Sequence, residues 1–177
     1  MINSEIILRY EKYLGLIKDV LVLPKSNTRK LKKAIRSYVP RGEIRSGSVL
    51  LLIDNTIFRS GKQGAIITSE MLFCFSNISG MFSIELEAIE SISPQIRRVF
   101  GNPQLGIVLN GDYFLSLPGM TEDSPVLRDF IELENFSVTD DFSPGLVFFA
   151  VFLHKVLGCE LSFEKESDPG PPPWYIQ

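Results

Sequence analysis

The stretch that most constrains the fold of this 177-residue chain is residues 49–75, VLLLIDNTIFRSGKQGAIITSEMLFCF. Three short apolar runs, at residues 49–53, 65–68 and 71–75, are rich in the residue types that favour strands. Turn-forming residues separate these runs, including the two glycines of SGKQG at residues 60–64. The pattern therefore predicts an antiparallel meander of three short strands.

The N-terminal segment, residues 1–42, is predicted to form a helical hairpin. Its first helix begins at a cap, Asn3 or Ser4, and its apolar stripe continues to Leu21 before Pro24 ends it. The second helix covers residues 29–38. The face of this helix opposite its apolar stripe carries the cations Arg29, Lys30, Lys32, Lys33 and Arg36.

After the meander, residues 81–117 predict further short strands. Residues 81–87 alternate apolar and polar side chains, the period of a half-buried strand, and apolar residues continue to a turn expected at Ser93-Pro94. Residues 97–100 are expected to form a further short strand that ends before a turn at Gly101-Asn102-Pro103. The pair Asn110-Gly111 is typical of a two-residue hairpin turn, which needs positive φ twice. Such an antiparallel sheet has to curl or close into a barrel to cover its edges.

The C-terminal third predicts two helices and a tail. Ser124-Pro125 begins the first helix, and Ser143-Pro144 begins a second that ends at Gly158. The second helix is apolar almost all round, so we expect it to be buried, and it is too short to span a bilayer. The predicted fold class is α+β, with an N-terminal helical hairpin at 1–42, a β-rich domain with C-terminal helices at 43–163, and a Pro-rich extended tail at 164–177.

Charge is divided unevenly along the chain. Residues 1–62 contain 13 Lys and Arg against 5 Asp and Glu, a balance of +8, whereas the remainder has 5 against 16, a balance of −11. The basic helix has three interpretations: it contacts phosphate on nucleic acid or lipid head groups, it meets an acidic protein partner or the acidic half of its own chain, or it is a solvated surface. A pI near 5.3 and the lack of a nucleic-acid-binding fold pattern argue against nucleic acid.

Residue patterns that indicate catalysis or metal binding are sparse. The single histidine, His154, lies near the predicted end of the apolar helix, where the helix dipole favours a structural role. Cys74 and Cys159 stand in apolar surroundings, which predicts buried thiols, a reducing cytoplasmic location and no cysteine metal site. The sequence therefore predicts neither an enzyme nor a cofactor.

Two further sets of charged residues are candidates for binding or for local structure. Asp54 and Lys62 are expected to form a salt bridge beside the turn of the meander. Asp140 and Asp141 precede the apolar helix, where capping explains them better than chemistry does. With the five cations of the basic helix, these four residues complete the set of candidate binding residues.

The residues Asp54, Thr56, Phe58, Ser60, Lys62, Gly64 and Thr68 follow the spacing D-x-T-x-F-x-S-x-K-x-G-x-x-x-T. This spacing resembles a pattern in bacterial proteins with pleckstrin-homology-like (PH-like) domains. Arg59 stands where that pattern often has glycine, so the local turn differs. The resemblance implies an antiparallel barrel or curled sheet with a closing helix, built to bind protein, peptide or lipid.

Three functions remain at this stage. The first is a cytoplasmic, non-catalytic module that binds a protein or peptide. The second is an immunity protein that neutralises a basic, nuclease-type bacterial toxin by covering its active site with acidic residues. The third is binding of anionic lipid head groups through basic residues between Arg29 and Arg45, which brings the chain to a membrane surface without spanning it.

Overall fold

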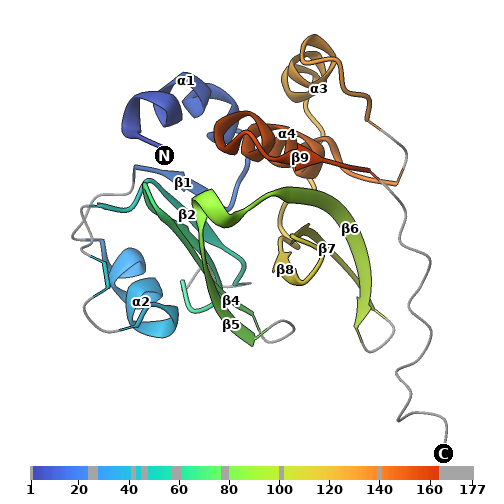
Figure 1. The fold of residues 1–177 in the computed structure, drawn as a ribbon. Helices are drawn as coiled ribbons and strands as arrows, with labels where there is room; N and C mark the ends of the chain where they lie inside the picture. The colour runs from blue at the N-terminus through green and yellow to red at the C-terminus, as the bar shows by residue number, and fades with distance from the viewer. Residues whose placement is uncertain are drawn as a thin grey trace, which may run out of the picture.

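The computed structural model describes residues 2–23, 28–40, 43–44, 48–56, 61–76, 80–99, 102–138 and 141–163, and shows an α+β fold (Figure 1). The helices are α1 (Ser4–Leu14), α2 (Arg29–Tyr38), the short 3-10 helix η2 (Leu86–Ala88), α3 (Pro125–Leu133) and α4 (Pro144–Leu157). The strands are β1 (Val20–Val22), β2 (Leu51–Asp54), β3 (Gly64–Ile67), β4 (Met71–Ser76), β5 (Gly80–Glu85), β6 (Ser91–Val99), β7 (Asn102–Leu109), β8 (Tyr113–Ser116) and β9 (Glu160–Leu161).

The strands form two sheets. The first sheet has the order β1-β2-β3-β4-β5, and all its neighbouring strands are antiparallel. The second has the order β8-β7-β6-β9, in which only β9 runs parallel to its neighbour. The predicted meander is confirmed as β2, β3 and β4. Within the described residues the two sheets do not close into one barrel.

The main hydrophobic core joins both sheets to α1, α3 and α4. Residues Pro144 to Leu153 of α4 are all buried, which confirms that this helix lies inside the molecule. Aromatic rings fill the contact between the helices: Phe130 of α3 lies 4.7 Å from Tyr13 of α1 and 5.1 Å from Phe148 of α4, between ring centroids. Rings of this size bury a large apolar area, so α4 holds the helical layer and the sheets together.

A second, smaller core lies on the opposite face of the first sheet, beneath α2. Leu31 and Ala34 of α2 are fully buried there, beside Leu52, Ile66 and Phe73 of the sheet. The first sheet is therefore covered on both faces, which explains why β2 and β3 are buried at every position and read as continuous apolar runs. In Figure 1, α2 stands apart from the other three α-helices.

The predicted N-terminal helical hairpin is wrong: strand β1 separates α1 from α2, and the two helices contribute to different cores on opposite faces of the first sheet, although the second helix is confirmed as α2. Helix α1 ends at Leu14 with Gly15 as its C-cap, and Val20–Val22 forms strand β1 instead of continuing the helix. Strand β1 pairs with β2, Val20 opposite Ile53. In this strand Val20 is buried, and Leu21 and Val22 are partly buried.

The turn predicted at Ser93-Pro94 is also wrong, because both residues lie within the nine-residue strand β6. The carbonyl of Ile92 accepts a hydrogen bond from Ser162 N–H at 3.0 Å, so the backbone at this position faces the edge away from β7. Pro94 follows two residues later on the same edge, beyond the last residue that pairs with β9. A proline is tolerated there because no ladder bond requires its missing N–H.

Polar contacts link the two sheets at one end. The side-chain amide of Asn55, just after β2, donates to the backbone carbonyl of Ser116 at the end of β8. The carboxylate of Glu122, which precedes α3, accepts from Lys18 N–H at 2.9 Å.

Among the described helices, none has the length and apolarity that crossing a membrane requires.

Candidate functional site

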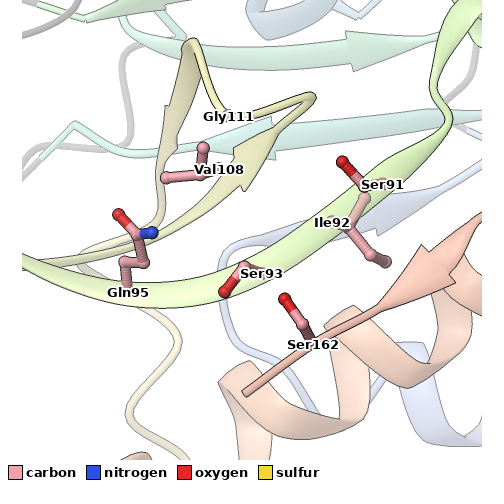
Figure 2. Close-up of a pocket in the computed structure, with 7 residues that line it drawn as sticks. All are labelled: Ser91, Ile92, Ser93, Gln95, Val108, Gly111 and Ser162. Atoms are coloured by element: carbon pink, nitrogen blue, oxygen red, sulfur yellow. The ribbon is translucent and has the colours of Figure 1, made fainter. Parts of the chain in front are cut away.

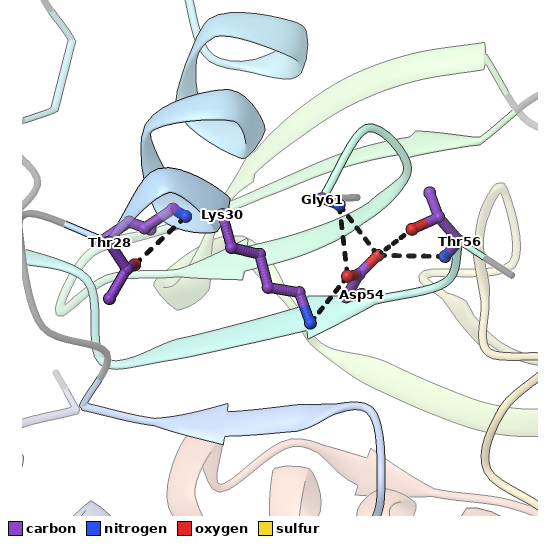
Figure 3. A network of polar contacts seen from close by, with 6 residues as sticks. Thr28, Lys30, Asp54, Thr56 and Gly61 are labelled. Atoms are coloured by element: carbon purple, nitrogen blue, oxygen red, sulfur yellow. Dashed lines mark hydrogen bonds and ion pairs between the residues drawn. The ribbon is translucent and has the colours of Figure 1, made fainter. Parts of the chain in front are cut away.

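A buried carboxylate, Asp54, lies at the end of β2 and connects three segments of the chain (Figure 3). Its side chain is 0% exposed, and its Oδ2 is 2.7 Å from the ammonium of Lys30 in α2. Its Oδ1 accepts from the backbone N–H and the hydroxyl of Thr56, at 3.0 and 2.6 Å. The N–H of Gly61 lies 3.2 Å from both carboxylate oxygens. All of these donors belong to the protein, so the carboxylate is occupied internally.

Burial and hydrogen bonding act on this carboxylate in opposite directions. Removal from water alone would raise the pKa of Asp54, because it disfavours the charged form. The hydrogen bonds from Lys30 and Thr56, together with the charge of Lys30, outweigh that effect and hold the pKa of Asp54 below its ordinary value. Asp54 is therefore a structural anion at neutral pH and a poor proton donor or acceptor for catalysis.

The glycines of the same motif permit close backbone approaches. Gly61 has φ +70°, and a Cβ at this position would lie 2.8 Å from the carbonyl oxygen of Lys30. Gly64 has φ +140°, and a Cβ there would lie 1.9 Å from the carbonyl oxygen of Ile53. Larger residues would thus push the loop away from α2 and from β2.

Thr68 completes the structural explanation of the motif. Its hydroxyl accepts from the N–H of Met71 at 2.9 Å and from that of Glu70 at 3.3 Å, which organises the turn between β3 and β4. Asp54, Thr56 and Thr68 thus hold turns through hydrogen bonds, whereas Gly64 permits the close approach of β3 to β2 and Lys62 is exposed. Phe58 and Ser60 lie outside the described residues.

The predicted salt bridge between Asp54 and Lys62 is wrong. Asp54 forms its ion pair with Lys30, which comes from a helix 24 positions earlier in the sequence, and Lys62 is exposed to solvent. Sequence reasoning placed Lys30 among the surface cations because periodicity does not show which helical side chain reaches a buried acid. The side chain of Lys30 retains only 22% of its exposure.

The remaining predicted cations of α2 share one surface stripe, here named the basic face: Arg29, Lys32, Lys33 and Arg36. Their spacing of three and four residues aligns them along the helix, opposite the buried Leu31 and Ala34. Lys33 is half-buried and the other three are exposed. None of the four forms an ion pair within the part of the chain that the structure describes.

An acidic surface that the sequence analysis did not single out lies around η2, and we name it the acidic corner. Its members are the exposed residues Glu70, Glu85, Glu87, Glu90, Asp112 and Glu160. Backbone bonds bring them together: Leu86 N–H donates to Glu70 O at 2.7 Å, and Glu160 N–H donates to Glu90 O at 2.8 Å. The signal available in the sequence was the absence of any Lys or Arg between Lys62 and Arg97.

The side chain of Asn110 holds the β7–β8 turn, which carries Asp112, against this corner. Its carbonyl accepts from Glu90 N–H at 2.8 Å, and its amide donates to Ala88 O at 2.6 Å. None of the six carboxylates forms an ion pair among the described residues. The acidic corner is therefore a preformed surface with uncompensated negative charge.

The ion pairs between described residues do not join the basic and acidic halves of the sequence. Lys30–Asp54 lies within residues 1–62, whereas Arg128–Asp123 and Lys155–Glu134 lie within the acidic remainder, at 2.7, 2.7 and 2.6 Å respectively. These three ion pairs therefore do not pair one half with the other.

The predicted acidic pair before α4 is only partly described. Asp141 is exposed in the turn that precedes the helix, and Asp140 lies outside the described residues. Ser143 is the N-cap of α4, and its side chain accepts from Leu146 N–H at 3.4 Å. The structure does not bring Asp141 together with the basic face, which lies on the opposite side of the first sheet.

A small pocket of about 170 Å³ lies beside β6 (Figure 2). Its lining includes the hydroxyls of Ser91, Ser93 and Ser162, the amide of Gln95, and Val108 and Gly111. None of the described residues that line it has a carboxylate, imidazole, thiol or amine side chain.

His154 and the two cysteines have structural positions. The Nδ1 of His154 lies 2.6 Å from the carbonyl oxygen of Cys159, and because a carbonyl only accepts, this nitrogen carries the proton. Burial raises the pKa of the Cys74 thiol to about 12 and also raises that of Cys159, so both thiols are protonated at neutral pH. Among the described residues, no group of three His, Cys, Asp or Glu side chains is placed to hold a metal ion.

Neither a protein-family model, nor a curated protein, nor a solved structure matches this chain.

Proposed function

We propose that this chain is a non-catalytic binding module whose basic face binds an acidic surface of a partner protein. The observation that carries the proposal is the set of four cations on one stripe of α2 that have no acidic partner in the described structure. Clustered cations on one rigid face attract a partner of opposite charge and orient it during encounter.

The basic face is held in a fixed orientation, which lowers the entropy cost of binding. Thr28 caps the start of α2 by accepting from Leu31 N–H at 3.3 Å. Lys30 ties the same turn to the buried Asp54, and Ala34 packs against the sheet one turn further on. The cations therefore project from a helix that is fixed at its start and along its buried side.

The arrangement of the sheets supports the further proposal of a PH-like domain. Two sheets share one core, and α4 packs on that core beside both of them. A fold of this kind displays loops and helices on a stable scaffold, and its ligand depends on the surface that it displays. The proposed ligand-binding surface here is α2.

A specific observation also favours the second candidate function, an immunity protein for a basic toxin. The acidic corner presents six exposed carboxylates without a cationic neighbour in an ion pair. Carboxylates arranged in this way can replace the phosphates that a nuclease binds in its active site. In this candidate, the acidic corner covers the toxin and the basic face is not required.

The test compares binding of a poly-glutamate peptide by the intact chain and by the variant Lys32→Glu/Lys33→Glu. Reversing two of the four cations is expected to weaken binding by about fourfold or more, because each exposed charge pair contributes about 0.2–1 kcal/mol and the reversal replaces two attractions by two repulsions. The matched control, Arg9→Glu/Lys18→Glu, makes the same charge change at exposed positions outside α2 and should leave binding within about twofold of wild type.

Three results would contradict the proposal. Equal loss of binding in the control variant would show that net charge, and not the basic face, attracts the peptide. Stronger binding to vesicles containing phosphatidylserine than to the peptide would favour the lipid alternative. Binding to poly-lysine that is lost in Glu85→Lys/Glu87→Lys, with no binding to poly-glutamate, would favour the immunity protein.

A further inference from the structure

We propose that the basic face of one copy of this chain binds the acidic corner of a second copy. This inference deepens the proposed function, on which it rests for the binding surface, by naming a partner of the basic face. It concerns a contact between two copies, because the described ion pairs of one chain leave both surfaces unpaired.

The two surfaces are complementary in charge. The basic face carries four cations, and the acidic corner carries six carboxylates, all without ion-pair partners among the described residues. No basic residue separates Lys62 from Arg97 in the sequence, so the segment that supplies Glu70, Glu85, Glu87 and Glu90 brings no cation with it. A second copy therefore meets each surface with charges of the opposite sign.

Both surfaces are preformed, so the contact does not require either to fold on binding. The basic face is fixed by the buried side of α2 and by the Lys30–Asp54 ion pair. The acidic corner is fixed by backbone bonds around η2 and by the side chain of Asn110. Preformed surfaces lose little conformational entropy when they associate.

The contact joins two different surfaces of the chain. If two copies make it reciprocally, the interface is isologous and closes a dimer; if they do not, it is heterologous and builds a ring or an open chain. Because exposed side chains make the contact, it should be strong at about 0.01 M ionic strength, where the Debye length is about 30 Å, and weak near 1 M, where it is about 3 Å.

The experiment is sedimentation velocity of the full chain at these two ionic strengths, with variants that reverse each surface. Lys32→Glu/Lys33→Glu removes two cations from the basic face and adds two carboxylates. Glu85→Lys/Glu87→Lys removes two carboxylates from the acidic corner and adds two cations. Wild type and the Arg9→Glu/Lys18→Glu control should associate at low salt and dissociate at high salt. Each reversed variant should sediment as a monomer under both conditions.

An equimolar mixture of the two variants should associate at low salt, because the intact basic face of Glu85→Lys/Glu87→Lys meets the intact acidic corner of Lys32→Glu/Lys33→Glu. This recovery also shows that neither variant is misfolded. Monomeric wild type at low salt, a mixture that stays monomeric, or association that persists in both reversed variants would each overturn the inference.

Binding of poly-glutamate to Glu85→Lys/Glu87→Lys separates this inference from the proposed function. That variant keeps an intact basic face, so it should bind the peptide at least as tightly as wild type. Peptide binding without self-association would refute the second copy as partner and keep the proposed function. Self-association that depends on both surfaces, without peptide binding, would refute the general acidic partner.

Discussion

The most informative perturbation of this fold is the replacement Asp54→Asn, which keeps the side-chain volume and removes the charge. The remaining carbonyl oxygen can still accept from Thr56 and from Gly61 N–H, which lies 3.2 Å from both carboxylate oxygens, but the new amide places its own hydrogens toward the Lys30 ammonium, 2.7 Å away. The ammonium thus loses its acceptor, and Gly61 N–H loses one of two, in a site where the carboxylate is fully buried.

The expected loss of unfolding free energy is about 2–4 kcal/mol. Hydrogen bonds to a charged group contribute about 1.5–3 kcal/mol each, and leaving one member of a buried ion pair unpaired costs about 3–5 kcal/mol. The lower part of that range applies because Lys30 keeps 22% exposure and can turn toward water. Urea unfolding followed by circular dichroism at pH 7 measures the difference.

The same variant has a defined pH dependence. The pKa of Asp54 is lower in the folded protein than in the unfolded chain. The ionised carboxylate therefore contributes its full stabilisation above the unfolded pKa, about 3.9. This contribution is lost as the pH falls from there toward the folded pKa. The free-energy difference between wild type and Asp54→Asn should therefore shrink as the pH is lowered from about 4. A difference that stays constant over that interval would show that the ionised carboxylate is not what stabilises the site.

A double-mutant cycle assigns the partner of the carboxylate. Lys30→Met should destabilise the fold and show a coupling energy with Asp54→Asn of about 1–3 kcal/mol, because the two side chains are in direct contact. Lys62→Met should remain within about 0.5 kcal/mol of wild type, because Lys62 is exposed. Coupling of Asp54 with Lys62 instead of Lys30 would refute the geometry of the site.

Three other substitutions test the scaffold by urea unfolding. Gly64→Ala should lower the free energy of unfolding by more than about 3 kcal/mol, because its Cβ would lie 1.9 Å from a carbonyl oxygen. Gly80→Ala should lower it by about 1 kcal/mol, because Gly80 has positive φ but no atom within 4 Å of the added Cβ. Equal losses for the two variants would contradict this explanation. Asn110→Gly keeps the turn but removes the side-chain hydrogen bonds to the loop before β6, and should lower the free energy of unfolding by about 1 kcal/mol. An unchanged free energy would show that these hydrogen bonds do not stabilise the fold. Phe149→Ala should cost about 3–5 kcal/mol through the cavity left in α4, and a cost below 1 kcal/mol would mean that the helix is not packed as described.

Elements whose limits depend on local chemistry were predictable from the sequence. Asn110 and Gly111 adopt φ of 51° and 77°, as a two-residue hairpin turn demands. Ser143 and Gly158 begin and end α4 at the predicted positions, Gly158 with a left-handed φ of 71°. In each case the residues that permit the turn or the helix end are adjacent in the sequence to the element that requires them.

The candidate site was only half predictable. The four cations of the basic face were identified because helical periodicity alone aligns them. The acidic corner was missed because its members come from separate parts of the chain: the β3–β4 turn, β5, η2, the residue before β6, the β7–β8 turn and β9. Its grouping depends on contacts such as that of Glu160 N–H with Glu90 O, which periodicity does not encode.

By itself, the sequence determined the strands of the meander, the caps of the helices, the hairpin turn and the buried nature of α4. The tertiary structure alone decided that Val20–Val22 is a strand, that Pro94 lies within β6, and that Asp54 pairs with Lys30. The first group follows from the backbone preferences and apolar spacing of adjacent residues. The second depends on which distant segments lie alongside, because a strand needs a partner edge and a buried charge needs whichever counter-charge the fold brings within reach.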